Sequence, residues 1–362
     1  MDRIGDLVRW EPAILIHNQP HYEGAGLDAR QIAPGQFGSQ YPRMTRLATG
    51  DWILVYTIYD NNGYTFDPTG GNKLEVAISH DNARTWQTLA QLADPGRDLD
   101  NGQIIELAGG TLLLAMRSVR WQESYRLPVY RSQDGGRTWA FLSTIDEAEG
   151  EPGSLGDPDK GIYEPHFYRL ADGTLSVMYA SEKHVTEEPS YSQIISQKVS
   201  EDGGRTWGPE IWVAWDTEDA RARPGMPVWG KLADGSYMVV FEVCGTKDCN
   251  VYFKRSKDGI SWEPGLGQPI PDQMGGPYLE IAPDNTLFVT SNSQQLSYSF
   301  DAGETWYTNR EAPWEAWWVK ENVWSSVYWT GEKEIAHLTS AARSARGEPG
   351  QGHNIQVRFG HY

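Results

Sequence analysis

Two glutamates stand out because each lies where the sequence otherwise reads as a β-strand. Glu164 occurs in Ile-Tyr-Glu164-Pro-His, and Glu242 occurs in the apolar run Val-Val-Phe-Glu242-Val-Cys. An unpaired carboxylate is costly in an apolar run, so Glu242 needs a partner, a raised pKa or contact with water. Two neighbouring carboxyl groups can serve as general acid/base and nucleophile, and glycoside hydrolysis uses such a pair. The alternative is structural, with each carboxylate capping a loop or pairing with an arginine.

The elements that would position these glutamates are marked by a repeated motif, S-x-D-x-G-x-T-W. Its five copies begin at Ser79, Ser132, Ser200, Ser256 and Ser299. The first copy has Ala83 in place of the glycine, and the fourth is one residue shorter. The Asp can accept backbone N–H bonds, the Gly permits positive φ, and the Trp buries a large face. We therefore expect a structural turn between strands, without a catalytic role.

Each motif closes a longer unit of apolar runs and turns. Two β-rich runs flank a turn such as Asp172-Gly173, a third run leads into the motif, and a fourth follows its Trp. Four antiparallel strands per repeat are typical of a β-propeller blade. A sixth blade is split: residues 328–339 and 354–360 supply three strands, and residues 10–18 supply the outer one. The prediction is an all-β, six-bladed β-propeller, a single domain over residues 1–362, whose last blade is closed by the N-terminal strand.

Aligning the blades on their first turn brings residues of different blades to one end of the central channel. Nine residues before the turn glycine or its equivalent stand Tyr41, Asn101, Glu164, Met226, Gly276 and Asn322. Seven residues after it stand Thr57, Arg117, Ala180, Glu242 and Asn292. The two glutamates thus fall in neighbouring blades at the same end, where the long loops also lie.

Several other residues at that end are candidates for binding a sugar. Tyr41, Asn101, Arg117 and Asn292 can hydrogen-bond hydroxyl groups, although each also suits a satisfied inner-strand position. The cluster Trp314-Glu-Ala-Trp317-Trp318 offers either a stacking platform or the packing of a long loop.

Composition limits the classes of partner. The net charge of −18 disfavours nucleic acid and anionic membranes, and no apolar run is long enough to span a bilayer. The start of the chain lacks the pattern of a signal peptide, which leaves the compartment open. The scattered histidines show no metal-ligand spacing, so neither a metal site nor a cofactor is expected. Cys244 and Cys249 fit either a small disulfide loop or two reduced thiols.

The repeats resemble the Asp-box repeats of sialidases and related six-bladed propeller hydrolases over essentially the whole chain. Sialidases use three arginines and a tyrosine. The first arginine corresponds here to Gln40, the second to Ala180 and the tyrosine to Trp324. Arg43 or Arg117 would have to substitute in space. In sialidases the arginines bind the carboxylate of sialic acid. A site without that cluster is expected to bind a neutral sugar.

The better resemblance is to glycoside hydrolase family 93, the exo-α-1,5-L-arabinanases. It implies a retaining mechanism with Glu164 as nucleophile and Glu242 as acid/base, a role that burial of Glu242 suits. It further implies linear α-1,5-L-arabinan as substrate and short arabino-oligosaccharides as products. From their positions at the same end of the channel, the expected substrate-binding residues are Tyr41, Arg43, Asn101, Arg117, Asn292 and Trp324. A monomer that acts outside the cell is the accompanying expectation.

Two alternatives remain open at this point. A sialidase would need three cationic groups converging on the channel and a tyrosine beside Glu164. A non-catalytic propeller that binds a glycan or a protein would have Glu164 and Glu242 far apart or separately neutralised.

Overall fold

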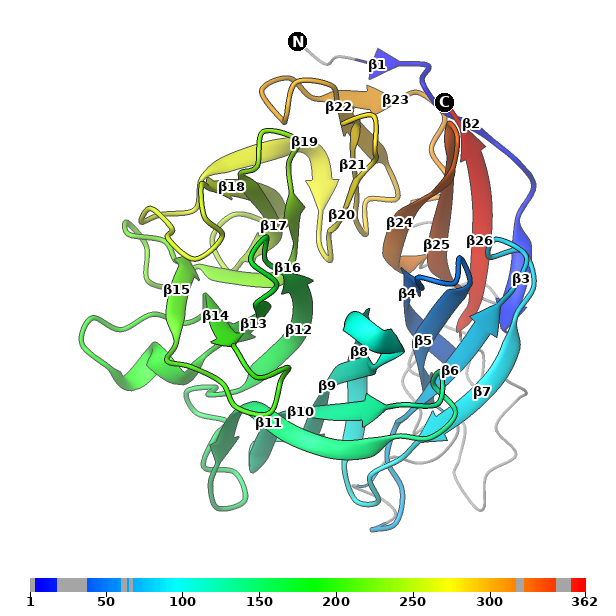
Figure 1. The fold of residues 1–362 in the computed structure, drawn as a ribbon. Coiled ribbons are helices and arrows are strands. Elements are labelled where there is room, and N and C mark those ends of the chain that lie inside the picture. The colour runs from blue at the N-terminus through cyan, green and yellow to red at the C-terminus, as the bar shows by residue number, and fades with distance from the viewer. Residues whose placement is uncertain (1–3, 18–37, 60–63, 65–67, 317–321, 343–352) are drawn as a thin grey trace.

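The chain folds into antiparallel sheets arranged around a central axis (Figure 1). The computed structural model describes residues 4–17, 38–59, 64, 68–316, 322–342 and 353–362. Within these ranges the regular structure is strand apart from two short 3₁₀ turns, Ala108–Gly110 and Lys183–Thr186. The all-β prediction is therefore confirmed. No helix among the described residues is long and apolar enough to cross a membrane.

Three sheets contain four consecutive strands each. The first consists of β8 (Asp98–Glu106), β9 (Leu112–Arg120), β10 (Ser124–Ser132) and β11 (Ala140–Glu149). The second consists of β12 (Ile162–Arg169), β13 (Leu175–Ser181), β14 (Ile194–Ser200) and β15 (Ile211–Ala214). The third consists of β16 (Arg223–Lys231), β17 (Tyr237–Cys244), β18 (Asn250–Ser256) and β19 (Gln268–Met274).

A fourth sheet repeats this plan and gains a strand from the start of the chain. It consists of β20 (Tyr278–Ile281), β21 (Leu287–Thr290), β22 (Leu296–Ser299) and β23 (Tyr307–Asn309), with β1 (Ile4–Gly5) parallel to β23. The sequence did not indicate β1, because a strand of two residues carries no periodic pattern.

The remaining strands form one extended sheet. It runs through β24 (Val323–Gly331), β25 (Glu334–Ala342), β26 (His353–His361), β4 (Gly38–Arg46), β5 (Trp52–Tyr59), β6 (Lys73–Ser79) and β7 (Gln87–Leu92). The link between β26 and β4 is a single parallel pair, His353 with Gly38, so β4–β7 and β24–β26 behave as two units.

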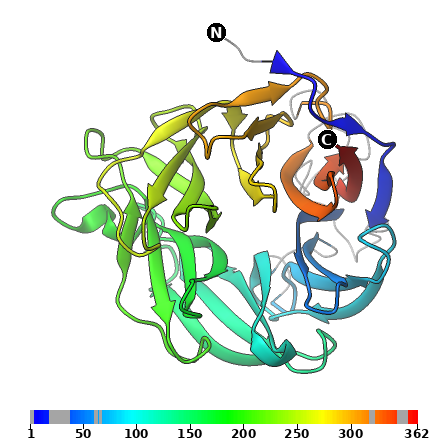
Figure 2. The same ribbon diagram turned by 45° about the horizontal axis from the view of Figure 1, so that its top comes forward.

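The N-terminal segment pairs with the last strand. β2 (Arg9–Trp10) and β3 (Ile14–His17) both run antiparallel to β26, with Trp10 opposite Gly360 and Ile14 opposite Val357. Figure 1 shows blue β3 alongside red β26, and Figure 2 shows the same two strands from a tilted view. Residue 18, the last of the expected outer strand, lies outside the described residues.

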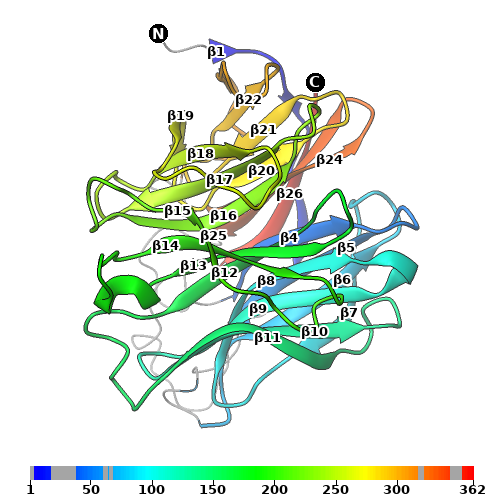
Figure 3. The same ribbon diagram turned by 60° about the vertical axis from the view of Figure 1, so that its left-hand side comes forward.

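The core lies between the faces of neighbouring sheets. Val55 of β5 and Leu114 of β9, for example, are fully buried in one apolar cluster, to which Trp139 adds its ring. Figure 3 shows the sheets side-on, stacked face to face around the axis. Such packing fixes each innermost strand against its two neighbours, which is what a site built from several strands requires.

The repeated motif forms a turn between the third and fourth strands of a sheet. In the second copy the Asp134 carboxylate accepts bonds from the Thr138 backbone N–H (2.9 Å) and hydroxyl (2.5 Å). These bonds, together with one from Ser132, hold the pKa of Asp134 well below its usual range. The Trp139 indole N–H donates to the Gly136 carbonyl at 2.9 Å. The turn is thus a self-contained element of the scaffold.

Candidate active site

A residue in the left-handed conformation recurs at the same place near the start of each innermost strand. Positive φ occurs at Tyr41 (59°), Asn101 (54°), Glu164 (62°), Met226 (55°), Gly276 (49°) and Trp324 (57°). At five of these positions the strand register shifts as in a β-bulge, and Gly276 lies two residues before β20. Bulges redirect side chains, and non-glycine residues with positive φ gather at functional sites.

One member of this set differs from the alignment made on the sequence. Asn322 was expected in the last unit, but Trp324 has the positive φ. Asn322 lies nine residues before Gly331, which the sequence alignment uses as the turn residue of the last unit. In the structure the left-handed turn residue of this unit is Lys333 (φ 58°), as Gly50 and Asn285 are in other units. Counting nine residues back from Lys333 gives Trp324. The Asn322 side chain instead donates to the Glu315 carbonyl at 2.9 Å.

The same correction adds a residue that sequence reasoning missed. Seven residues after Lys333 stands Ser340, whose hydroxyl accepts the Tyr41 backbone N–H at 3.0 Å. The carboxamide of Asn292 likewise accepts the Trp324 N–H at 2.7 Å. At Tyr41 and Trp324 the backbone N–H is therefore bound by a side chain at or just after the second strand of the neighbouring unit.

Glu164 and Glu242 both lie close to Gly225, and the three residues belong to three different strands. Glu164 projects from β12, and Glu242 projects from β17, directly opposite Gly225 of β16. A Cβ atom placed on Gly225 would lie 3.4 Å from Glu164 Oε2 and 3.5 Å from Glu242 Oε1. The two oxygens are therefore no further apart than the sum of these distances. Both side chains are only partly buried.

Backbone N–H groups orient both carboxyl groups. The Met226 N–H donates to Glu164 Oε2 at 2.7 Å, and the Gly276 N–H donates to Glu242 Oε2 at 2.5 Å. Both donors belong to the recurring set of left-handed residues, which therefore supplies the N–H groups that hold the pair.

Both carboxyl groups have raised pKa values. Burial, reinforced by the nearby charge of Glu242, raises the pKa of Glu164 to about 8. Burial also raises the pKa of Glu242, against the opposing effects of the Gly276 N–H and Arg223. Two interacting carboxyl groups share the titration, so the proton belongs to the pair as a whole. One acid and one carboxylate, side by side, are what proton transfer coupled to nucleophilic attack requires.

A buried ion pair borders the glutamates. Glu182 is almost fully buried and accepts hydrogen bonds from Arg223, from the Tyr163 hydroxyl (3.0 Å) and from the Gly161 N–H (2.7 Å). Neither Glu182 nor Arg223 was singled out from the sequence. Glu182 directly follows β13 and lies two residues after Ala180, the position that aligns with Glu242.

Arg117 is already paired. Its Nη2 lies 3.0 Å from Asp100 Oδ2, and Asp100 also accepts the Thr57 and Tyr59 hydroxyls and the Asn101 N–H. Sequence reasoning missed Asp100, although it immediately precedes Asn101. The side-chain oxygen Oδ1 of Asn101 and the Nε of Arg117 are buried without a hydrogen-bond partner.

Arg43 is buried beneath aromatic rings. Its Nη1 donates to the carbonyls of Pro42 (2.8 Å) and Trp324 (3.0 Å), and its guanidinium lies 3.9 Å from the centre of the Tyr41 ring. Burial raises the pKa of Tyr41 to about 12, so its hydroxyl stays protonated. The Trp324 indole donates to Gln40 at 3.2 Å. Four of the expected binding residues therefore lie together, in the units that contain β4, β21 and β24: Tyr41, Arg43, Asn292 and Trp324.

The tryptophan cluster is only partly described. The Trp314 indole donates to His337 Nδ1 of β25 at 2.9 Å, which is a packing contact within the last unit. Trp317 and Trp318 lie outside the described residues.

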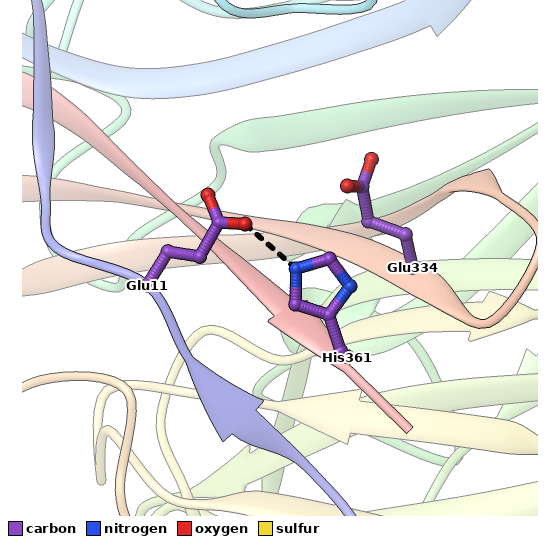
Figure 4. Close-up of side chains that lie close together, drawn as sticks. All are labelled: Glu11, Glu334 and His361. Carbon is purple, nitrogen blue, oxygen red and sulfur yellow. Dashed lines mark hydrogen bonds and ion pairs between the residues drawn. The ribbon is translucent and has the colours of Figure 1, made fainter.

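One group of potential metal ligands occurs among the described residues, namely Glu11, Glu334 and His361 (Figure 4). His361 Nε2 lies 2.7 Å from the Glu11 carboxylate, and Arg84 lies 2.8 Å from that of Glu334. Because the guanidinium already neutralises Glu334, this donor set suits a charge network that ties the two ends of the chain to β6–β7, and it fits a cation poorly.

Cys244 and Cys249 form a disulfide bond, which resolves the two possibilities left open by their spacing. The bond closes the connection between β17, which carries Glu242, and β18.

Comparison with solved structures finds several enzymes of the same fold. An arabinobiose complex of the α-L-arabinanase from Penicillium chrysogenum has a TM-score of 0.75 and 22% identity, covering 97% of this chain and 98% of that one. An arabinobiose complex of the family 93 α-L-arabinofuranosidase from Fusarium graminearum has a TM-score of 0.76 and 19% identity, covering 96% and 97%. The NanB sialidase from Streptococcus pneumoniae is less similar, with a TM-score of 0.61 and 12% identity, covering 96% and 70%.

These comparisons confirm the predicted resemblance to family 93 at the level of the fold. A search of curated proteins finds no match. The BNR repeat-like domain matches residues 39–264, which is more than half of the chain. The chain therefore belongs to the BNR repeat-like domain family.

Proposed function

We propose that the protein is a retaining glycoside hydrolase that acts from the chain end on linear α-1,5-L-arabinan and releases short arabino-oligosaccharides. The observation that carries this proposal is that Glu164 and Glu242 both lie beside Gly225, with both pKa values raised. Retaining glycosidases hold their two carboxyl groups about 5–5.5 Å apart, and the upper limit set by Gly225 is compatible with that spacing.

The mechanism assigns a different task to each carboxyl group. Glu242, in its protonated form, gives its proton to the glycosidic oxygen as the bond breaks. Glu164 attacks the anomeric carbon and forms a glycosyl-enzyme. Glu242 then takes a proton from water, which releases the sugar with retained configuration. The Met226 and Gly276 N–H groups hold the two carboxylates in place through both steps.

A neutral sugar fits the surroundings of the pair better than an acidic one. Arg117 is neutralised by Asp100, and Arg43 donates to backbone carbonyls beneath Tyr41. Gln40, at the position of a sialidase arginine, is bonded to Trp324 and His353. This argues against a sialidase with a rearranged arginine cluster. The two solved relatives bound to arabinobiose support an arabinan as the substrate.

The binding residues are proposed from their place around the pair. Two sets of equivalent positions border the end of the axis where the glutamates lie. The left-handed set contributes Tyr41, Asn101 and Trp324. The set at the ends of the second strands contributes Arg117 and Asn292. In this proposal Arg43 supports the Tyr41 ring from below and does not contact the sugar.

The architecture belongs to the same proposal. We infer six blades in a single domain over residues 1–362, with the ring closed where β2 and β3 pair with β26. The disulfide supports a protein that acts outside the cell, since such bonds persist in oxidising compartments. We further propose that it acts as a monomer without a cofactor.

The test is incubation of the protein with linear α-1,5-L-arabinan and, separately, with a fluorogenic sialoside. Arabino-oligosaccharides released from arabinan alone, and lost in Glu164→Gln and Glu242→Gln, are the expected result. Release from the sialoside would restore the acidic-sugar alternative. Binding of arabinan without turnover, equal in the two variants, would favour a non-catalytic propeller.

A further inference from the structure

Glu242 belongs to a closed chain of contacts that runs through the disulfide. Its Oε2 accepts the Gly276 N–H at 2.5 Å, and the adjacent Gly275 N–H donates to the Cys249 carbonyl at 2.8 Å. Cys249 is joined to Cys244, which lies two residues after Glu242 on β17. The disulfide and these hydrogen bonds thus connect Gly276, whose N–H binds Glu242, to β17, the strand that carries Glu242.

Gly275 and Gly276 are closely packed, so a side chain at either position would meet a neighbour. Both have positive φ, 71° at Gly275 and 49° at Gly276. A Cβ on Gly276 would lie 2.9 Å from the Trp324 ring, and one on Gly275 would lie 3.2 Å from the Asn292 amide nitrogen. The Gly275 carbonyl also accepts the Asn292 N–H at 2.8 Å. The turn therefore lies between Glu242 and the start of β24. Its two N–H groups bind Glu242 of β17 and Cys249, which directly precedes β18.

We propose that the Cys244–Cys249 disulfide and the Gly275–Gly276 turn form a positioning device for Glu242. The disulfide fixes the Cys249 carbonyl, that carbonyl anchors Gly275, and Gly276 then presents its N–H to the carboxylate. The inference deepens the proposed function and rests on it, since it assigns residues that position the acid/base without contacting substrate. Opening of the disulfide releases the anchor and loosens the N–H donor.

The charged groups around Glu242 set the sign of the expected effect. Glu164 of β12 raises the pKa of the pair, whereas Arg223 of β16 and the Gly276 N–H lower that of Glu242. The titratable and charged groups that face Glu164 in turn are Arg117, Glu182 and Tyr41. Because the Gly276 N–H stabilises the charged carboxylate, loosening it raises the upper apparent pKa of the pair. Catalysis needs the singly protonated pair, so the basic limb of the activity profile moves to higher pH.

The experiment compares the full chain with the double variant Cys244→Ser/Cys249→Ser on linear α-1,5-L-arabinan from pH 4 to 9. We expect kcat to fall about tenfold or more, as for a misplaced catalytic group, with little change in KM. The basic limb should move to higher pH. The matched control is Lys247→Ala, within the same loop, which removes a long ion pair to Asp216 (3.8 Å) and leaves the disulfide intact. It should behave as the unmodified protein.

A second route to the open loop uses the natural sequence. Dithiothreitol reduces the disulfide to two thiols while its own two thiols become a cyclic disulfide. It should reproduce the loss of kcat and the shifted limb in the unmodified protein, and should not affect the double variant. An unchanged kcat and limb in both experiments overturns the proposal. The proposal is also overturned if kcat falls in parallel with the melting temperature while the basic limb of the pH profile stays in place. That result would be a purely structural effect.

A separate readout distinguishes this inference from the proposed function. If the unmodified protein hydrolyses no glycoside, the proposed function fails. The Glu242 carboxyl is then followed by ¹³C NMR titration, with its signal assigned by Glu242→Gln. A higher titration midpoint in the double variant supports the positioning device, and an unchanged midpoint overturns it.

Discussion

Gly225 pairs directly with Glu242 across β16 and β17. Because glycine has no side chain, the space between Gly225 and the Glu164 carboxylate stays open. The neighbouring N–H, that of Met226, is bonded to Glu164. Two consecutive residues of β16 therefore contribute to the site: Gly225 leaves space beside both carboxyl groups, and Met226 orients that of Glu164. The first prediction concerns this glycine.

Gly225→Ala should lower kcat/KM on linear α-1,5-L-arabinan by about tenfold to a hundredfold, because displacement of reacting groups by an ångström has such an effect. The new methyl group would lie 2.9 Å from Gln193 Nε2, tighter than its contacts with either glutamate. Gly331→Ala is the control, since a Cβ there meets nothing within 4 Å. Equal kinetics for the two variants would show that the space beside Gly225 is not used.

Glu164→Gln and Glu242→Gln should each reduce turnover by at least about a thousandfold while leaving the melting temperature equal or higher. Each change removes a buried acidic group whose ionisation is disfavoured, so stability should not fall. Circular dichroism on heating and product analysis on arabinan measure the two effects. A variant that unfolds earlier than the unmodified protein would point to a structural carboxylate.

The roles of the two glutamates are separated by added azide. With an activated arabinoside, Glu242→Ala should be rescued to a glycosyl azide of retained configuration, because the nucleophile Glu164 is still present. Glu164→Ala should give the inverted azide, formed by direct attack in the vacated space. NMR of the products distinguishes the two. The opposite pattern would exchange the assigned roles.

Stability should depend on pH through the Glu164–Glu242 pair, and the raised pKa of Glu164 sets the expected range. This pKa is raised from an ordinary value of 4.5 to about 8, so the folded state binds this proton more tightly than the unfolded state. The resulting stabilisation is complete below pH 4.5 and is lost as pH rises through about 8. The difference in unfolding free energy between the unmodified protein and Glu164→Gln, measured in urea from pH 4 to 9, should follow this course. A difference that is constant over that range would contradict the raised pKa.

Asn309→Ala should destabilise the fold by about 2–4 kcal/mol, since several buried hydrogen bonds are lost at once. Its side chain accepts the N–H groups of Leu7 and Val8 and donates to the carbonyls of Val8 and Glu311, which ties the N-terminal segment to β23. Activity per folded molecule should persist. The control is Glu304→Ala, an exposed partner of Arg255, which should alter the unfolding free energy by less than about 0.5 kcal/mol.

The sequence by itself determined the elements that repeat. Five copies of one turn motif, at intervals that fit four short strands, left few arrangements other than blades around an axis. The same regular spacing allowed Glu164 and Glu242 to be placed at one end of the molecule from offsets to a turn glycine. The offset failed only where the turn is irregular: Lys333 replaces glycine as the left-handed residue, and Trp324 takes the place expected of Asn322.

The tertiary structure decided which polar groups meet. Asp100 beside Arg117, Arg223 beside Glu182, and the Gly276 N–H on Glu242 all join residues 17 to 41 positions apart. No local pattern marks such contacts, because they depend on how adjacent strands pair and how sheets pack. The state of Cys244 and Cys249 was likewise open until the β17–β18 connection brought them together. Short-range periodicity specifies strands and turns, whereas the distances that govern catalysis arise only when separate strands converge at the axis.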